Sequence, residues 1–80
     1  MGHPRRRPKR LAEKLRQIRM HLGVSQSELV RQLGLDIPHS NISKFELDKN
    51  EPDTIVMLAY ARRVGVRVEQ FLDDDLELNL

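Results

Sequence analysis

Apolar residues recur along most of this chain at intervals of three and four, the spacing that places them on one face of an α-helix. The first such stretch covers residues 11–22 and ends at Gly23, a residue type that commonly stops helices. The second covers residues 26–33, begins after the N-cap residue Ser25 and ends at Gly34. Both stretches therefore predict short amphipathic helices.

A third stretch covers residues 39–47, where Ile42 and Phe45 are three positions apart and so face the same way. Asn41 and Lys44 then face another way, away from the interior. Helices of this length are unstable alone and must pack against each other. Two short helices joined by a few residues, with small polar and basic side chains on the second, predict a helix-turn-helix that can lay its second helix in a DNA groove.

The connection between these two helices contains Pro38, a residue type that suits the first position of a helix. We therefore expect Asp36 or Ile37 to be the N-cap of the helix that follows. After that helix, residues 48–52 form a loop rich in turn-forming residues.

Two further helices are expected over about residues 53–64, ending at Gly65, and over residues 66–72. The core stripe of the longer helix consists of Met57, Tyr60, Ala61 and Val64. Three apolar residues project away from that stripe, namely Ile55, Val56 and Ala59. They indicate either a contact surface for a partner or ordinary surface aliphatic residues.

The whole pattern predicts an all-α fold, a compact five-helix domain over residues 11–72. Eighty residues make one domain. Because the chain has no Trp and only three other aromatic residues, aliphatic side chains must fill most of its core.

Charge is concentrated at the two ends of the chain. Residues 1–10 contain two prolines and no acidic residue, and their five basic residues are Arg5, Arg6, Arg7, Lys9 and Arg10. This composition predicts a disordered basic arm that neutralises phosphates or enters a minor groove. A tail that only improves solubility is the alternative.

The other end, residues 73–80, is an acidic tail in which Leu76, Leu78 and Leu80 alternate with polar residues. Alternation is typical of a strand, which could pair with a second subunit. A frayed chain end is the alternative.

Several classes of function are disfavoured by composition. Without Cys there is no disulfide, no thiolate metal site and no Cys nucleophile. No apolar run approaches a membrane span or a signal peptide, so we expect a cytoplasmic protein with no membrane association. The three histidines are scattered without metal-ligand spacing. We therefore expect no enzyme activity, no metal, no cofactor and no small-molecule ligand.

The chain resembles the lambda-repressor-like family of helix-turn-helix DNA-binding proteins, also called the Cro or XRE family. The resemblance covers about residues 11–72, in the family's order. The residues that carry it are Leu15-Arg16-Gln17-Ile18-Arg19, Leu22-Gly23-Val24-Ser25-Gln26, Glu28-Leu29, Leu33-Gly34-Leu35, Ile42-Ser43-Lys44-Phe45-Glu46, Pro52, Val64-Gly65-Val66 and Phe71-Leu72.

What the resemblance implies is a domain that binds double-stranded operator DNA and regulates transcription, most often as a repressor. The residues implied to contact bases are His39, Ser40, Asn41 and Lys44. Those implied to contact phosphates are Gln26, Ser43, Lys49 and Asn50. The resemblance also pairs Arg19 with Glu46, which would satisfy an arginine that lies beside the apolar stripe of the first helix.

Three features depart from the family. The turn between the second and third helices is about two residues longer, Val30 stands where a small alanine is common, and Arg67 stands where Ser or Thr usually begins the last helix. A longer turn allows the third helix to lie farther from the second, which leaves room for the larger Val30 side chain. We therefore interpret the first two departures as compensating.

A recognition helix of this size seldom holds a DNA site alone, which predicts a homodimer on a two-fold related operator. The surface around Ile55, Val56 and Ala59, or the acidic tail, could hold the second copy. The competing hypothesis is a protein-interaction module, an adaptor or antitoxin-like partner that uses the same helices or the tail. The acidic tail favours this hypothesis, whereas the basic arm and Lys44 favour DNA.

Overall fold

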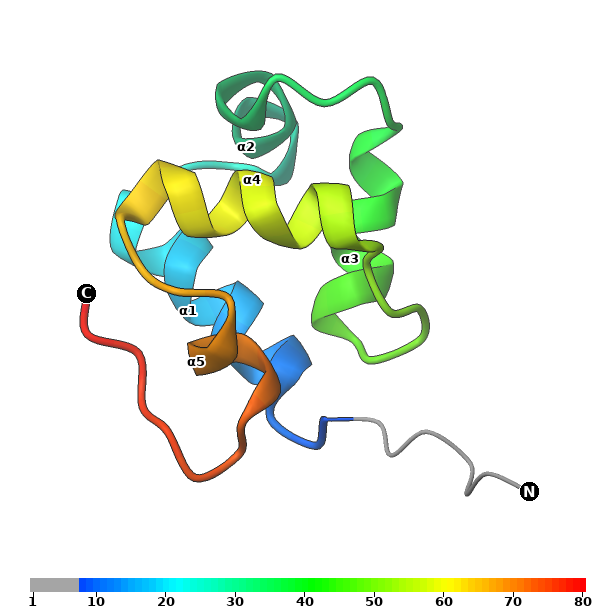
Figure 1. Cartoon of the computed structure of the whole chain (residues 1–80). Coiled ribbons are helices and arrows are strands. Elements are labelled where there is room, and N and C mark those ends of the chain that lie inside the picture. Colours follow the sequence, from blue (N-terminus) through cyan, green and yellow to red (C-terminus); the bar gives the residue numbers. More distant parts are fainter. Residues whose placement is uncertain (1–7) are drawn as a thin grey trace.

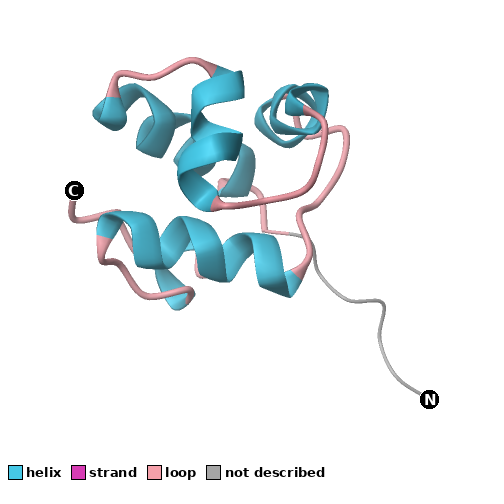
Figure 2. Ribbon diagram, turned by 90° about the horizontal axis from the view of Figure 1, so that it is seen from above, coloured by secondary structure: helices cyan, strands magenta, loops and turns pink. Residues whose placement is uncertain are grey.

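The computed structural model describes residues 8–80, which form five α-helices and no strand (Figure 1). The helices are α1 (Leu11–Leu22), α2 (Gln26–Leu33), α3 (His39–Glu46), α4 (Thr54–Val64) and α5 (Glu69–Leu72). This confirms the predicted all-α, five-helix fold, and Figure 2 shows that loops alone connect the helices. Within residues 8–80, no helix combines the length and the apolar character needed to cross a membrane.

The helix ends follow the local signals in the sequence. The Ser25 Oγ accepts a hydrogen bond of 3.1 Å from the backbone N–H of Glu28, so it caps α2 as predicted. Asp53 caps α4 in the same way, since its Oδ1 accepts a bond of 2.9 Å from the Val56 N–H. At the other end of α2, Gly34 has φ +66°, a left-handed conformation that costs glycine little because it has no Cβ.

The core lies where α1 meets α3, α4 and α5, and where α2 packs against α3 and α4. Six of its side chains are completely buried, namely Leu15, Ile18, Leu29, Ile42, Tyr60 and Phe71. Aliphatic residues supply most of this core, together with three aromatic rings, those of Phe45, Tyr60 and Phe71. Burial of this apolar surface holds the short helices together, because none of them is long enough to be stable by itself.

The long connection between α2 and α3 is anchored rather than free. Leu35 and Ile37 are partly buried against the core, which explains how the chain accommodates two additional residues there. The N-cap of α3 is Pro38, whose ψ of 144° is extended. The expected cap at Asp36 or Ile37 is therefore wrong, because the helix begins one residue later, after the proline rather than at it.

Val56 is also placed differently from its prediction. It is only 6% exposed, because α3 and the connection before it cover the first turn of α4 on this side. Ile55 is 68% exposed and Ala59 is half-buried. A candidate contact surface on α4 therefore contains Ile55 and Ala59 but not Val56.

The last helix is shorter than predicted, since α5 begins at Glu69 and has no side-chain cap. The Gln70 Oε1 accepts a hydrogen bond of 3.0 Å from the Arg67 N–H just before the helix. This contact partly replaces the Ser or Thr cap that the sequence lacks.

Lys14 is a buried cation in α1, although the charge of a lysine normally predicts exposure. Its side chain is 0% exposed, and its Nζ donates to the carbonyl oxygens of Gln70 at 2.6 Å and Asp73 at 2.9 Å. These carbonyls belong to the end of α5, where backbone oxygens lack partners within the helix. Lys14 therefore fastens α5 to α1.

The first part of the acidic tail folds back beside the start of α1, below α5 in Figure 1, and the end of the chain then turns away from it. The Asp74 carboxylate accepts hydrogen bonds of 3.0 Å from the backbone N–H groups of Lys9 and Arg10. The Arg10 guanidinium donates to both carboxylate oxygens of Glu77, at 3.0 and 2.8 Å. We call this group of contacts the terminal clasp.

The terminal clasp corrects two expectations about the chain ends. Residues 8–10 do not belong to a disordered arm, because Lys9 and Arg10 are bound to the tail. Residues 1–7 lie outside the described residues. The tail is not a strand either, and the Leu78 side chain packs against the core.

Candidate nucleic-acid interface

Helix α3 has an inner face and an outer face, as the sequence predicts. Ile42 and Phe45 are buried in the core, at 0% and 7% exposure. On the opposite side, Ser40 and Lys44 are exposed and Ser43 is half-buried, at spacings of three and four. The predicted orientation of α3 is confirmed, with Lys44 as the cation on its outer face.

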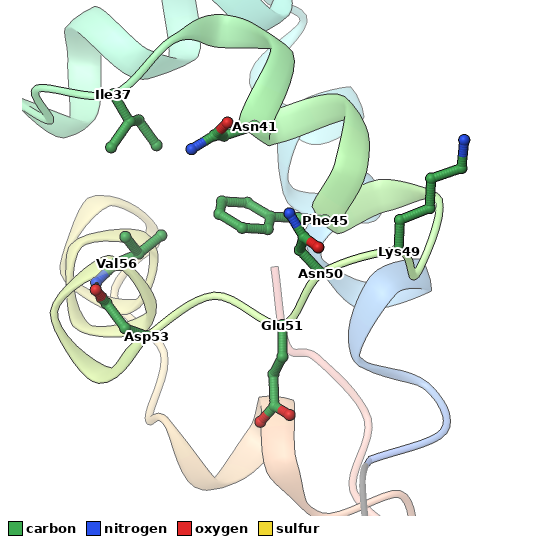
Figure 3. A pocket seen from close by; sticks show the side chains of 8 residues that line it. All are labelled: Ile37, Asn41, Phe45, Lys49, Asn50, Glu51, Asp53 and Val56. Atoms are coloured by element: carbon green, nitrogen blue, oxygen red, sulfur yellow. The ribbon is translucent and has the colours of Figure 1, made fainter.

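His39 and Asn41 flank this outer face. His39 is exposed in the first turn of α3, beside Ser40. Asn41 is half-buried and lines an open pocket of about 490 Å³ between α3 and the start of α4, together with Ile37, Phe45 and Val56. Figure 3 shows the amide of Asn41 directed into this pocket. Asn41 thus lies at the edge of the outer face, less exposed than expected.

Leu47 belongs to the outer face and was missed in the sequence. It is the C-cap residue of α3, three positions after Lys44 and four after Ser43, and it is 62% exposed. The spacing of three and four residues from Lys44 and Ser43 already indicates that Leu47 shares their side of the helix. A leucine at a helix end is ordinarily assigned to the core, so this position on the polar side was not predicted.

The loop after α3 remains close to its last turn. Lys49 and Asn50 both donate their backbone N–H to the carbonyl oxygen of Lys44, at 2.9 and 3.3 Å. Asp48 makes this possible with φ +60°, a left-handed conformation that Asp tolerates better than most residues. The backbone at Lys49 and Asn50 is therefore held at the end of α3, and both residues are exposed and line the same open pocket as Asn41.

Gln26 is the first residue of α2 and is half-buried. The N–H groups at a helix start have no partner within the helix, and the helix dipole favours an anion there. The cap from Ser25 uses one of these N–H groups, that of Glu28. The amide side chain of Gln26 and the remaining N–H groups suit a phosphate oxygen.

Arg19 and Glu46 form the predicted ion pair between α1 and α3. The Arg19 Nε and Nη2 donate to the two carboxylate oxygens of Glu46 at 2.8 and 2.9 Å, and Nη1 donates to the carbonyl of Val24 at 3.1 Å. The hydrogen bonds to Glu46 raise the pKa of Arg19 above its ordinary value. Because this geometry is bidentate, the pair ties the end of α3 to α1 at a defined position.

Tyr60 lies near this pair and is completely buried. In the described part of the chain, its hydroxyl is a buried side-chain oxygen that has no hydrogen-bond partner. Burial raises the pKa of Tyr60 above its ordinary value, with a further contribution from the charge of Glu46. The ring of Tyr60 therefore belongs to the hydrophobic core, and its hydroxyl makes no hydrogen bond within the described residues.

The base of the predicted basic arm lies near α3. Lys9 is exposed and lines a surface groove that also includes Glu46, at the end of α3. Arg10 is bound to Glu77 in the terminal clasp, which removes it from the expected set of free DNA-binding cations. Arg5, Arg6 and Arg7 lie outside the described residues.

The chemistry available on this surface is that of hydroxyl, amide, imidazole and ammonium groups together with one alkyl side chain. Among residues 8–80, no three His, Asp or Glu side chains come together in a way that could hold a metal ion. Such groups can hydrogen-bond, neutralise anions and make apolar contacts.

Comparisons with known proteins agree with this arrangement. The sequence profile of a family described as helix-turn-helix domain matches residues 12–74. No curated protein sequence matches the chain. Among solved structures, the P22 c2 repressor in complex with a synthetic operator is similar at a TM-score of 0.70 and 25% identity, over 81% of this chain and 96% of that one.

Two further solved structures are similar to this chain, with slightly lower TM-scores. A hypothetical transcription factor, NHTF, from Neisseria is 30% identical with a TM-score of 0.66, over 89% of this chain and 84% of that one. The restriction-modification controller protein C.AhdI from Aeromonas hydrophila is 22% identical with a TM-score of 0.65, over 78% of this chain and 91% of that one. The chain therefore belongs to the lambda-repressor-like family of helix-turn-helix domains.

Proposed function

We propose that this chain is a sequence-specific transcription regulator, a repressor, that binds double-stranded DNA with α3 in the major groove. The observation that carries the proposal is the outer face of α3, where Ser40, Ser43 and Lys44 point away from the core. The similarity to a repressor solved in complex with an operator supports it.

Recognition of DNA requires two kinds of contact. Phosphate contacts set the position of the protein, whereas contacts to base edges select the sequence. We assign phosphate contacts to Gln26, Ser43, Lys49 and Asn50. We assign base contacts to His39, Ser40, Asn41 and Lys44, with Asn41 reaching from the edge of the face. A lysine suits guanine O6 and N7, and an asparagine suits adenine N6 and N7.

Selection of bound duplexes from a random pool tests DNA binding and yields an operator. On that operator, Lys44→Ala should lower the preference at one base pair, at a cost of about 1–3 kcal/mol in discrimination. Lys49→Ala, the matched control from the adjacent loop, should weaken operator and random duplexes alike. Equal losses on both duplexes for both variants would contradict this division of roles.

The basic arm should add affinity that depends steeply on salt. Deletion of residues 2–7 removes Arg5, Arg6 and Arg7 but leaves the terminal clasp intact. If all three arginines neutralise phosphates, the slope of log K against log salt should flatten by about 2 to 3 units, since each contact contributes about 0.9. An unchanged slope would assign the arm to solubility.

We further propose a homodimer on a two-fold related operator, with half-sites about one helical turn apart. Ile55 and Ala59 on α4, or the tail, are the candidate contacts. Size measurement of the protein alone and on one operator, together with the symmetry of the selected sites, tests this assembly. A single protomer on an asymmetric site would contradict it.

The second candidate function is a protein-interaction module. The observation that favours it is the set of exposed apolar side chains outside the outer face of α3, including Met20 and Ile55 at 60% and 68% exposure. Failure to enrich any duplex, combined with capture of a defined protein partner that Ile55→Ser abolishes, would favour this function over DNA binding.

A further inference from the structure

Leu47 is an exposed leucine in a surface that is otherwise polar and basic. It is 62% exposed at the end of α3, and its backbone N–H is bonded to the carbonyl of Ser43 at 3.0 Å. Exposed apolar side chains are common on protein surfaces, so it is the position of Leu47, beside Ser43 and Lys44 on the outer face, that bears on function.

The helical geometry places Leu47 in line with the proposed base contacts. At 100° per residue, positions 40, 43, 44 and 47 fall within about 60° of a common direction. Ile42 and Phe45 lie on the opposite, buried side. A DNA surface that lies along the whole of this face would therefore meet Leu47 as well as Ser40 and Lys44.

We propose that Leu47 contacts the 5-methyl group of a pyrimidine base in the major groove and so determines specificity at that base pair. This inference rests on the proposed function, and it adds a contact that hydrogen-bonding residues cannot make. An alkyl side chain cannot bind a phosphate or a base edge by hydrogen bonds. The apolar group that the major groove presents is the methyl group of thymine, which apolar side chains contact. Methylated cytosine carries the same group at the same ring position.

The dimensions of α3 allow this contact. Eight residues span about 12 Å, so a helix that lies along the major groove passes about three to four base pairs at roughly 3.4 Å each. Lys49 and Asn50, held next to the last turn by the carbonyl of Lys44, can anchor that end to the DNA backbone. Leu47 then lies between the backbone contacts and Lys44.

The experiment replaces each thymine of the selected operator by deoxyuridine, one at a time, which removes only the methyl group. The dissociation constant is measured at fixed salt for the wild-type chain, for Leu47→Ala and for Met20→Ala. Met20 is a matched control because it is comparably exposed, at 60%, but belongs to α1. Thermal unfolding of all three proteins reports whether each variant remains folded.

For the wild-type chain, we expect one thymine in each half-site whose replacement weakens binding about fourfold, the effect of losing one buried methyl-sized group. Met20→Ala should keep this penalty, whereas Leu47→Ala should bind more weakly to the original operator and lose the penalty. If the selected site has cytosine there, 5-methylcytosine should strengthen binding by the wild-type chain and by Met20→Ala but not by Leu47→Ala.

Three results would overturn the inference. These are a deoxyuridine penalty of equal size in Leu47→Ala, the absence of any methyl-dependent position, and Leu47→Ala binding the original operator as tightly as the wild-type chain. Each leaves DNA binding itself intact. A chain that enriches no duplex would instead overturn the proposed function, and this inference with it.

Discussion

Replacement of Lys14 by methionine tests what fastens α5 to α1. Methionine keeps most of the apolar stem but removes the ammonium group. The carbonyl oxygens of Gln70 and Asp73 then lose the donor that now lies 2.6 and 2.9 Å away. We expect Lys14→Met to destabilise the domain.

The size of the effect follows from opposing contributions. The Gln70 carbonyl is left without a partner, which costs about 1–3 kcal/mol. The Asp73 carbonyl still accepts a hydrogen bond of 3.0 Å from the Leu76 N–H. Because the Gln70 carbonyl is only part-buried and the variant no longer desolvates an ammonium, the lower end of that range applies. The net loss is about 1 kcal/mol, which for a domain of this size lowers Tm by roughly 4–8 °C.

The assay is thermal unfolding at neutral pH, followed by far-ultraviolet circular dichroism. Lys49→Met is the matched control, since Lys49 is exposed in the loop after α3 and its loss should change the free energy of unfolding by less than about 0.5 kcal/mol. The reasoning is refuted if the Tm of Lys14→Met lies within two or three degrees of the wild-type value, which is about the size of the control's own effect, or above it. Either result would mean that the free-energy cost of desolvating the ammonium matches or exceeds the free energy that its hydrogen bonds contribute.

Three further predictions concern stability. Tyr60→Phe should leave the free energy of unfolding unchanged or raise it by up to about 1 kcal/mol, because the hydroxyl is buried without a partner; a loss larger than that, measured by denaturant unfolding, would reveal a partner. Val30→Ala should lower Tm, because two methyl groups are removed from a side chain packed against the core; an unchanged or higher Tm would contradict the interpretation that the long turn and this side chain compensate. The pKa values of Asp74 and Glu77 are lowered by hydrogen bonds from Lys9 and Arg10, so the stability they add is complete at neutral pH, above their ordinary pKa values of 3.8 and 4.5, and is lost as the pH falls through the lowered ones. The double variant Asp74→Asn, Glu77→Gln should therefore be less stable than the wild-type chain at pH 7, and this difference should shrink as the pH falls below the ordinary pKa values of 3.8 and 4.5. A difference that does not change with pH would contradict this assignment.

Much of the fold could be predicted because its signals are local. The limits of α1, α2 and α4 depend on apolar spacing, on the caps Ser25 and Asp53, and on the glycines that end them, all of which lie within a few residues of one another. The start of α5 was less predictable, because no side chain caps it and packing decides where it begins.

The candidate interface was predictable where helical periodicity alone decides orientation, as for Ser40 and Lys44. Asn41 and Val56 were placed less well, since their exposure depends on how closely α3 approaches the start of α4. That distance is a property of the assembled core and not of either helix.

Lys14 and the terminal clasp were not predicted because charge is normally a signal of exposure. Lys14 lies three positions after Leu11 and four before Ile18, on the apolar stripe itself, but its partners are backbone oxygens that carry no mark in the sequence. The attraction between a basic start and an acidic end was visible in composition. Which residues would meet depended on the path of α5.

The terminal clasp also sets the shortest piece of this chain that can fold properly. A fragment that stops at Leu72, where the last helix ends, would lack the Asp73 carbonyl that binds Lys14 and both carboxylates that hold the start of α1. Trimming for crystallisation, or fusion to another protein, should therefore keep the chain through Leu78, whose side chain still packs on the core. Residues 73–78, which look dispensable by their charge, are part of the folded unit.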